Sequence, residues 1–589
     1  MAEPYISTRN GKQYMYRATS HYSQEKRGPV AETEYMGQVV DGKLVPKRGY
    51  FYDEKTREFG PINASMQSSD AGGVKDTALT SKIFGDAYFL NALQKRLSLR
   101  DDLKTSFGPE LGDRILAVAM AYTVMPCALM HIEEIIERRC IPELLGLPSD
   151  IDFSSPRLSE LTTEIGGLES AMESFFAKRL DAEDGLLIYD LTSETSYSVR
   201  NSLCEWGRNK DHLPAKQVNV GLVTNKGGRP VMFRLFPGSM ADVSTLNHLV
   251  EDMKRLKDSK DMTLVMDRGF ISVKSIYALF KKKMDFVAPL TIRDAPVFRS
   301  IIKGIIASIE SVKHRVIHNG KVYSLYTTHL GVRKCKDANK NTRQTVWEDP
   351  DGYELVGEDD EIYSSCEYYL DVFGFHDAEA AAEEVSGMDL ALDGIMKDLN
   401  GTYPRNPAES FKRAAGKYAS LLEWTMGEDG MQLSVKQNAH TFAANRKGIF
   451  IMIAPSDPER KWQSILDSYA VRDVIEDVFM EGKVKGDGRT PRSGDRKVIN
   501  GRMLIRMVAM IMKVEMLKRI SEVADDKKIK PADKPRNLSR RTPEDLLASL
   551  SNIERIYGNG WSHLTEITRD NRFVFKMFDI GPTKGLIEY

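Results

Sequence analysis

Short apolar runs and helical patterns alternate through the middle of the chain, from residue 184 to residue 290. Three apolar runs come first, and the turn-rich segment NKGGR joins the second to the third as a hairpin. A helical pattern, a strand pattern, a second helical pattern and a last strand pattern follow. In sequence these elements are GLLIYDLTS, KQVNVGLVT, RPVMFRLF, GSMADVSTLNHLVEDMKRLK, TLVMD, VKSIYALFKKK and DFVAPL.

This order predicts an α/β fold with a mixed sheet. Three strands, then helix, strand, helix and strand is the order of the ribonuclease-H-like fold, in which antiparallel strands come first and parallel strands are added through helices. Asp190 lies at the end of the first strand and Asp267 ends the fourth. These strands are neighbours in that order, so we expect both carboxylates at one edge of the sheet. Either Asp alone is more typical of a turn cap.

A second pattern, in residues 462–483, predicts one long amphipathic helix. The segment WQSILDSYAVRDVIEDVFMEGK has no Pro, and its apolar residues recur at helical spacing. At roughly 100° per residue, Tyr469, Arg472, Glu476 and Lys483 fall within an arc of roughly 60° on the polar side. The simplest interpretation is a solvated face with an Arg472–Glu476 pair four residues apart. The alternative is a functional face that carries one acid, two bases and a phenol.

Changes in pattern divide the rest of the chain into further segments. The N-terminal one interleaves Lys, Arg and Tyr with short β-like runs, and either contacts DNA or caps the structure. Eight cations and two acids lie between Lys483 and Arg506, in a loop that we favour as tracking phosphates over a solvated linker. The predicted segments are a small β-rich unit (1–80), a helical module (81–180), a catalytic core (181–290 and 448–520), a β-rich insertion (291–447) and a small C-terminal module (521–589).

Composition narrows the class of protein without deciding it. The chain of 589 residues is too long for one core, and its 41% hydrophobic and 28% charged content is typical of a globular protein. The net charge of −1 does not indicate a nucleic-acid partner, although local patches of positive charge matter more for such binding than the total charge. Five scattered cysteines without a CxxC pair argue against a zinc ribbon or a disulfide framework. We expect no membrane segment and a cytoplasmic location.

The candidate chemistry is that of clustered carboxylates. A helix packed on the sheet can bring Glu476 to Asp190 and Asp267, and three such acids repel one another unless a cation compensates. Oxygen ligands with open positions suit Mg²⁺ or Mn²⁺, and two such ions can promote in-line displacement at phosphorus. The chain has no GxxxxGK[ST], HExxH or GxSxG motif, so neither a nucleotide cofactor nor a protein nucleophile is indicated.

The spacing Tyr469-x2-Arg472-x3-Glu476-x6-Lys483 resembles the Tyr-Arg-Glu-Lys signature of DDE-type insertion-sequence transposases. The blocks YDLTS, LPAKQVNVGLV, FPGSMADVSTL, VMDRGF and GDGRTPRSGDRKVINGR also resemble blocks of that family, in the same order. The resemblance implies a ribonuclease-H-like catalytic domain interrupted by a β-rich insertion. It implies Asp190, Asp267 and Glu476 as the catalytic and metal-binding triad, with two Mg²⁺ or Mn²⁺ ions. It further implies that Tyr469, Arg472 and Lys483 bind the DNA of the element's ends.

The expected function is therefore a transposase that cleaves the ends of its own insertion element and joins them to target DNA. Its expected partners are double-stranded DNA, both terminal inverted repeats and target, and a second copy of itself when two ends are paired. The expected setting is a bacterial cytoplasm, at the nucleoid when DNA is bound. A ribonuclease-H-like structure-specific nuclease without strand transfer is the alternative enzyme, and a domesticated DNA-binding remnant is the non-enzymatic one. A Trp of the insertion stacks on a flipped base in some relatives, but for Trp347 and Trp424 core packing is the favoured interpretation.

Overall fold

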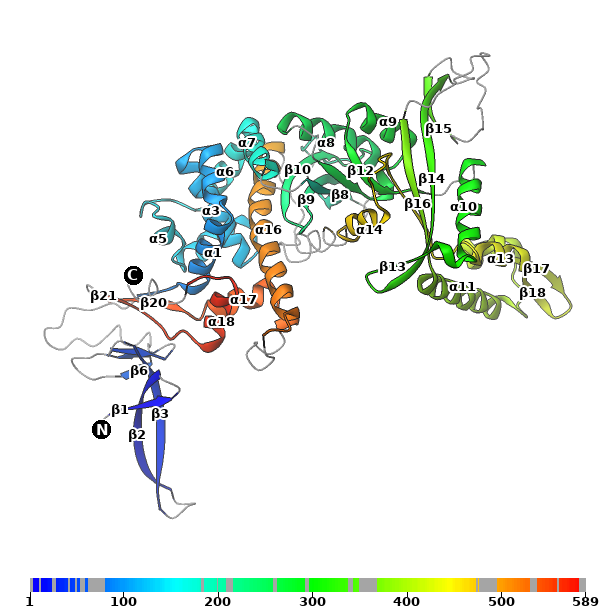
Figure 1. Ribbon diagram of the computed structural model, residues 1–589. Coiled ribbons are helices and arrows are strands. Elements are labelled where there is room, and N and C mark those ends of the chain that lie inside the picture. Colours follow the sequence, from blue (N-terminus) through cyan, green and yellow to red (C-terminus); the bar gives the residue numbers. More distant parts are fainter. Residues whose placement is uncertain are drawn as a thin grey trace.

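A computed structural model gives the architecture of the chain (Figure 1). It describes residues 4–9, 12–23, 28–40, 43–47, 50–52, 59–61, 80–181, 185–196, 198, 200–207, 215–257, 262–291, 296–336, 343–348, 368–472, 475, 495–529, 538–558 and 561–581. The described part is a mixed α/β protein with one large mixed sheet. It is elongated, with the first strands at one end, helices and the sheet in the middle and the insertion at the other end.

The large sheet has ten strands. The antiparallel strands β8 (Leu186–Thr195), β9 (Gln217–Asn225) and β10 (Pro230–Pro237) come first. Two parallel strands, β11 (Thr263–Met266) and β12 (Asp285–Pro289), follow on the other side of β8. The spatial order β10-β9-β8-β11-β12 and the intervening helices α8 (Asp242–Leu256) and α9 (Val273–Lys281) are as predicted from the sequence.

The sheet does not stop at β12 but continues through strands from residues 315–455. The added strands, in spatial order, are β19 (Ile449–Pro455), β16 (Tyr368–Asp377), β14 (Lys321–Lys336) and β13 (Arg315–His318), with β15 (Arg343–Glu348) on β14. Asn319 and Gly320 turn the β13–β14 hairpin, and both have positive φ, which that kind of turn needs. Helix α10 (Pro296–Ile309) contacts β14 and β16.

The helical part of the insertion has its own small core. Met388 and Leu392 of α11 (Ala378–Leu399) pack there with Met431 of β18 (Gly430–Val435). The other elements of this unit are α12 (Pro407–Ala415), β17 (Leu422–Gly427) and α13 (Gln437–Ala444). Trp424 packs against this core, with its ring 6.1 Å from that of Phe411, as favoured from the sequence. The side chain of Trp347 lies outside the described residues.

The predicted helical segment after residue 80 is helical. Its helices are α1 (Gly85–Arg96), α2 (Leu99–Phe107), α3 (Pro109–Val124), α4 (Ile132–Glu137), α5 (Ile141–Leu145), α6 (Ser155–Gly167) and α7 (Glu169–Asp181). The long helix α16 (Arg496–Asp525) packs against α6 and α3 and is buried along much of its length. Figure 1 shows α16, in orange, between this group and the sheet. Within the described part of the chain no single helix is long and apolar enough to cross a membrane, although Pro109–Val124 and Leu129–Glu137, bent by 93°, pass that test as a pair.

Both ends of the chain carry β structure. The first strands form a four-stranded sheet of β1 (Tyr5–Arg9), β2 (Lys12–Ser23), β3 (Gly28–Val40) and β4 (Lys43–Pro46), with a separate pair of β5 (Tyr50–Tyr52) and β6 (Phe59–Pro61). Near the C-terminus, β20 (Glu554–Gly558) pairs with β21 (Trp561–Leu564) and with β7 (Thr80–Ile83). Helices α17 (Pro543–Leu550) and α18 (Arg569–Met577) complete this end. The C-terminal elements thus pair with a strand from the N-terminal half.

One expectation about the 462–483 helix was wrong. Helix α14 runs only from Trp462 to Ala470. The backbone N–H of Arg472 donates to the carbonyl of Tyr469, three residues back, instead of the partner four residues back that an α-helix uses. The helix therefore tightens into a turn at residues 471–472, so Arg472 is not part of one unbroken α-helix with Tyr469. Glu476 and Lys483 lie outside the described residues, so their place on the predicted arc stays a prediction.

Candidate active site on strands β8 and β11

The sheet brings Asp190 and Asp267 together. Strands β8 and β11 are parallel, with Leu186 opposite Thr263 and Tyr189 opposite Met266. The same register, continued by one residue, places Asp190 opposite Asp267. Neighbouring strands lie about 4.8 Å apart, so the two carboxylates start from adjacent backbone positions. The expectation that β8 and β11 are neighbours is confirmed, but Asp190 does not end its strand. Strand β8 continues for five residues to Thr195, paired with β9, so only Asp267 follows the end of a strand.

Both acids lie on the sheet face that α14 covers. Side chains alternate between the faces of a strand, and Ile188 and Val265 belong to the core cluster on one face, whereas Tyr189 and Met266 belong to the cluster on the other. Asp190 and Asp267 are two positions beyond Ile188 and Val265, so they share that face. Ile465 and Leu466 of α14, and Ile475 after it, pack into the same cluster.

Each carboxylate is partly fixed by its own backbone. Asp190 Oδ1 accepts from the N–H of Leu191 at 2.7 Å, and Asp267 Oδ1 accepts from the N–H of Arg268 at 2.7 Å. Asp267 thereby caps the short 3₁₀ turn Arg268–Phe270. The structural role expected of an Asp after a strand is present, but it uses only one oxygen of Asp267. The other oxygen is directed to a cation.

That cation is Arg472. Its Nη2 lies 3.7 Å from Asp267 Oδ2, and its Nη1 donates to the hydroxyl oxygen of Tyr469 at 3.3 Å. The guanidinium also lies over the Tyr469 ring, with Cζ 5.9 Å from the ring centroid. Two of the residues expected to contact DNA are therefore next to the acid pair and in contact with each other.

Helix α14, which leads to this segment, is held at several points. Before it, Arg460 Nη2 donates to Asp285 Oδ1 at 2.7 Å, at the opposite end of the parallel strands. Within it, Asp467 Oδ1 lies 2.9 Å from His318 Nε2 in the β13–β14 hairpin. The Trp462 ring meets the His318 ring edge-on at 5.8 Å. Strands of the insertion therefore help to position α14.

Glu476, Lys483 and most of the cationic segment up to Arg506 lie outside the described residues. The predicted triad and the role of Lys483 stay predictions. Among the described residues no group of three or more His, Cys, Asp and Glu side chains has the arrangement of a metal site. Asp190 and Asp267 by themselves fit a divalent ion in donor chemistry, because adjacent carboxylates supply hard oxygen ligands and Asp267 already faces a cation.

The opposite face of the sheet supports the acid pair through a hydrogen-bonded chain that sequence reasoning missed. The buried Tyr189 hydroxyl donates to Thr245 Oγ1 at 2.8 Å, and the Thr245 hydroxyl donates to the carbonyl of Asp242 at 2.6 Å. Burial raises the pKa of Tyr189 well above its ordinary value, so the phenol stays protonated. The start of α8 is thus pinned beneath the residue that precedes Asp190. Tyr189 looks like an ordinary core residue in the sequence, which gave no signal for this contact.

A second connection reaches β8 from the long helix. Arg506 Nη1 of α16 donates to both Glu194 oxygens, at 3.0 and 3.2 Å. The negative charge of Glu194 raises the pKa of Arg506 well above its ordinary value. Glu194 is four residues after Asp190 on the same strand and, by alternation, on the same face. The cationic segment was expected to be a loop, but α16 already begins at Arg496. Arg506 lies inside α16, where it joins the helical module to the strand that bears Asp190.

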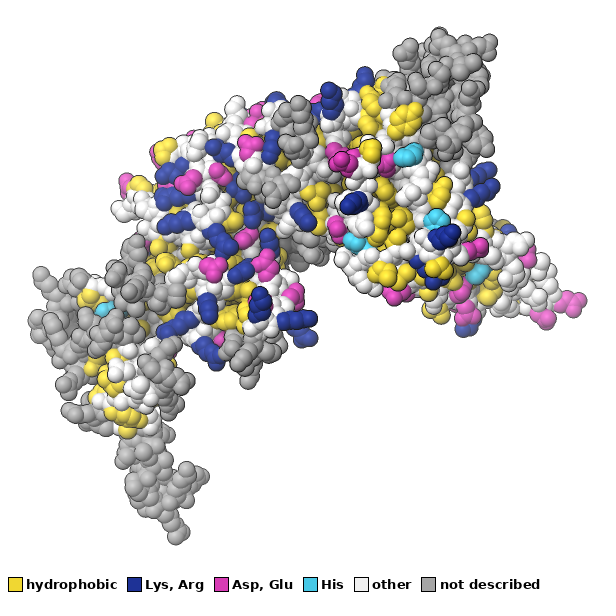
Figure 2. All heavy atoms as spheres, viewed as in Figure 1, with side chains coloured by type: hydrophobic (Ala, Val, Ile, Leu, Met, Phe, Trp, Pro, Cys, Tyr) yellow, Lys and Arg dark blue, Asp and Glu magenta, His cyan; other side chains and the backbone are white. Residues whose placement is uncertain are grey.

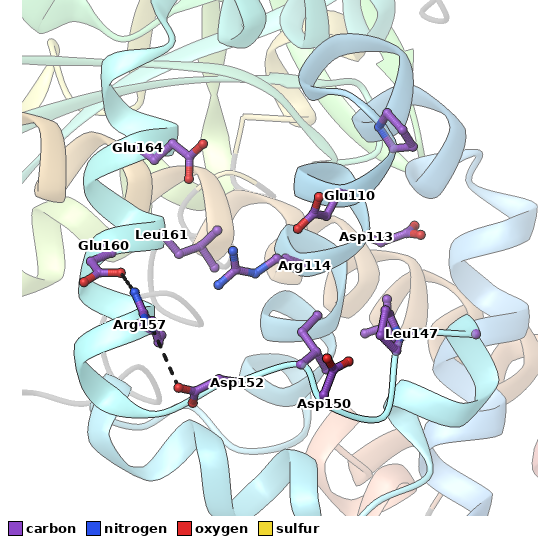
Figure 3. Close-up of a pocket in the computed structure, with 14 residues that line it drawn as sticks. Glu110, Asp113, Arg114, Leu147, Asp150, Asp152, Arg157, Glu160, Leu161 and Glu164 are labelled. Atoms are coloured by element: carbon purple, nitrogen blue, oxygen red, sulfur yellow. Dashed lines mark hydrogen bonds and ion pairs between the residues drawn. The ribbon is translucent and has the colours of Figure 1, made fainter.

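The described cavity in Figure 3 lies elsewhere, in the helical module. It has a volume of about 710 Å³. Its lining includes Glu110 of α3, Asp150 in the connection before α6 and Glu164 of α6. Arg157 is tied there to Glu160 at 2.6 Å and to Asp152 at 3.8 Å. The prevailing acidity makes this cavity unsuitable for a nucleic-acid phosphate. On the face shown in Figure 2, Lys and Arg are mixed with Asp and Glu, in agreement with the net charge of −1.

Residues 205–483 match the family described as "Transposase DDE domain". This match supports a DDE-type transposase. The matched region is a little under half of the chain; it includes Asp267, Tyr469 and Arg472 and ends at Lys483, but it begins after Asp190. Among solved structures, the chain resembles a piggyBac transposase synaptic complex with hairpin DNA, with 8% identity, coverage of 87% of this chain and 86% of that chain, and a TM-score of 0.34. A likeness of that degree does not establish a shared fold. No curated protein matches the sequence.

Proposed function

We propose that this protein is a DNA transposase that cleaves the ends of its own insertion element and joins them to target DNA by metal-dependent phosphoryl transfer. The single observation that carries the proposal is the parallel pairing of β8 and β11, whose register continued by one residue sets Asp190 opposite Asp267, with Arg472 beside Asp267. The match of residues 205–483 to a transposase DDE domain supports the same reaction class. We assign the sheet to the ribonuclease-H-like type on its strand order.

In this proposal Asp190, Asp267 and Glu476 hold two divalent ions, Mg²⁺ or Mn²⁺. When bound, such ions activate a water or a 3′-hydroxyl and stabilise the leaving oxygen of an in-line displacement. The sheet holds Asp190 and Asp267 in a fixed register, which presets the spacing of two of the ligands. Tyr469 and Arg472 contact the phosphates of the element's end, and Lys483 does so from the segment that follows.

The partners of this function are the terminal inverted repeats and the target duplex. Pairing two ends before joining requires two copies of the chain, so we propose a homodimer in the DNA complex. We place the reaction in the cytoplasm of a bacterial cell, at the nucleoid.

A cleavage and joining assay tests the proposal. The substrate is DNA that carries the inverted repeats flanking the reading frame, with Mg²⁺ present or replaced by EDTA. Asp190→Asn, Asp267→Asn and Glu476→Gln should each reduce cleavage by about a thousandfold, because a metal ligand contributes several kcal/mol to the barrier. Binding to the ends should be largely retained.

Asp285→Asn is the matched control. Asp285 is also a carboxylate on a parallel strand of this sheet, but it lies at the opposite end, with Arg460 and Thr263 as partners. It should cut at a rate close to wild type. Near wild-type cutting by two of the three triad variants would refute the site. Cleavage without joining of pre-cut ends would instead identify a nuclease without strand transfer.

A further inference from the structure

In the free protein the side chain of Arg472 contacts Asp267 and Tyr469, although binding a DNA phosphate does not require either contact. Its guanidinium lies between the Tyr469 ring and Asp267, with contacts at 5.9 Å to the ring centroid and 3.7 Å to the carboxylate. Its side chain is only 19% exposed and that of Asp267 is 32% exposed. The cation is therefore withdrawn from solvent towards the acid pair.

The acid pair needs such a cation. Two carboxylates that start from adjacent backbone positions repel each other, and an opposite charge within about 4 to 6 Å favours their ionised forms. The guanidinium carries a permanent charge at neutral pH, so it supplies this compensation without any bound ion. Asp267 Oδ1 is engaged by the N–H of Arg268, which leaves Oδ2 as the oxygen that faces Arg472.

We propose that Arg472 is an internal counter-ion that competes with divalent metal ions for Asp267. This inference rests on the proposed function, because it takes Asp267 as a metal ligand. In the free protein Arg472 neutralises Asp267 and weakens metal binding. A DNA phosphate that binds Arg472 draws the guanidinium away and frees Asp267 Oδ2. Arg472 thus acts as a positioning residue that couples the arrival of DNA to the loading of metal.

The backbone around Arg472 suits such a change of partner. Helix α14 ends at Ala470, and Arg472 lies in the turn that follows, bonded through its N–H to the Tyr469 carbonyl. A change of partner at this position moves a side chain beyond the helix end and breaks no backbone hydrogen bond of α14, although it gives up the contact with the Tyr469 hydroxyl. Linkage then requires that DNA and metal favour each other's binding by the same factor.

Mn²⁺ binding to the full-length chain without DNA tests the competition, with free Mn²⁺ measured by electron paramagnetic resonance. Arg472→Gln should bind Mn²⁺ about fivefold more tightly than wild type, since a partly exposed ion pair is worth up to about that factor. Arg472→Lys, which retains the charge, should remain close to wild type. Asp267→Asn should abolish this site in every background.

Arg460→Gln is the matched control. Arg460 also joins the α14 region to a carboxylate of the sheet, at 2.7 Å from Asp285, and its side chain is 13% exposed. It should leave Mn²⁺ affinity unchanged, although it removes the same charge from the same part of the molecule. If Arg472 had only a structural role, Arg472→Gln would gain no Mn²⁺ affinity, and the charge kept in Arg472→Lys would make no difference to that affinity.

The outcomes separate this inference from the proposed function. Mn²⁺ binding that depends on Asp267 but is equal in wild type and Arg472→Gln overturns the competition and leaves the metal site standing. Equal tightening by Arg460→Gln also overturns it, since the effect would then be one of general charge. If no variant binds Mn²⁺ through Asp267, the metal site of the proposed function is wrong and the competition is wrong with it.

Discussion

Two glycines set how closely helices α6 and α16 approach. A Cβ added at Gly501 of α16 would lie 2.8 Å from the carbonyl carbon of Thr162 in α6 and 3.0 Å from its Cα. A Cβ added at Gly166 of α6 would lie 2.6 Å from the carbonyl carbon of Lys497. Ordinary carbon contacts are about 3.5 to 4.0 Å, so neither position accepts Ala unless the helix axes separate. These neighbours are backbone atoms and have no rotamer with which to yield.

Gly501→Ala should therefore destabilise the α6–α16 pair. Replacing Gly by Ala in a helix interior normally gains about 1 kcal/mol. Overpacking in a well-packed core costs about 1 to 3 kcal/mol, and a backbone clash is at the upper end. The net expectation is a loss of about 2 kcal/mol. Gly387 is the matched control, because it lies in α11 with no heavy atom within 4 Å of an added Cβ, so Gly387→Ala should gain about 1 kcal/mol.

Native-state hydrogen exchange measures both effects in one chain, since it reports the opening free energy of each helix separately. Amides of α6 and α16 should lose protection in Gly501→Ala, and amides of α11 should gain it in Gly387→Ala. Unchanged or increased protection of α16 in Gly501→Ala would refute the close approach. The result bears on the candidate site because α16 carries Arg506, which holds Glu194 on the strand of Asp190.

Two titratable groups at the junction of β7, α5 and β20 give further predictions. Burial raises the pKa of Glu143, but hydrogen bonds from Tyr557 and Lys82 outweigh it, so the pKa lies below its ordinary value of 4.5. Because the folded pKa is depressed, the stability from Glu143 is present above pH 4.5 and is lost as the pH falls through the folded value. The difference in melting temperature between wild type and Glu143→Gln should therefore shrink below pH 4.5, and a constant difference from pH 6 to 3 would contradict this origin. Burial raises the pKa of the Cys140 thiol to about 11. Thiol reagents at pH 8 should therefore modify the partly exposed Cys127 well before Cys140. Mass spectrometry of the labelled peptides measures the two rates.

The acid pair could be predicted from the sequence because local rules suffice for it. Apolar runs of five to eight residues, with helical patterns between them, give the order of β8, β11 and β12 along the chain, and in the ribonuclease-H-like order the strands of Asp190 and Asp267 are neighbours. Once the strands are parallel neighbours, the register follows from which side chains must face each core. Ile188 and Val265 face one core and Tyr189 and Met266 the other, which excludes a register shifted by one residue.

Pairings between distant segments could not be predicted in this way. Strand β12 pairs with β19, which is separated from it by the whole insertion, and β20 pairs with β7 across most of the chain. The alternation that identifies a strand does not say which other strand supplies its hydrogen bonds. The end of α14 was missed for a related reason, because the periodicity of residues 462–483 is helical throughout, whereas the turn at Arg472 coincides with a tertiary contact to Asp267.

The two described parts of the candidate site are held by different means, and this decides how the insertion acts on it. Asp190 lies within β8 and Asp267 directly follows β11, so the pairing of these two strands sets the spacing of their backbones. Tyr469 and Arg472 depend on α14, which is held by His318 of the β13–β14 hairpin through Asp467. A displacement of that hairpin therefore moves the cation and the phenol relative to the acids. Among the described residues, the contact between Asp467 and His318 is therefore a route by which the insertion can act on the candidate site through α14.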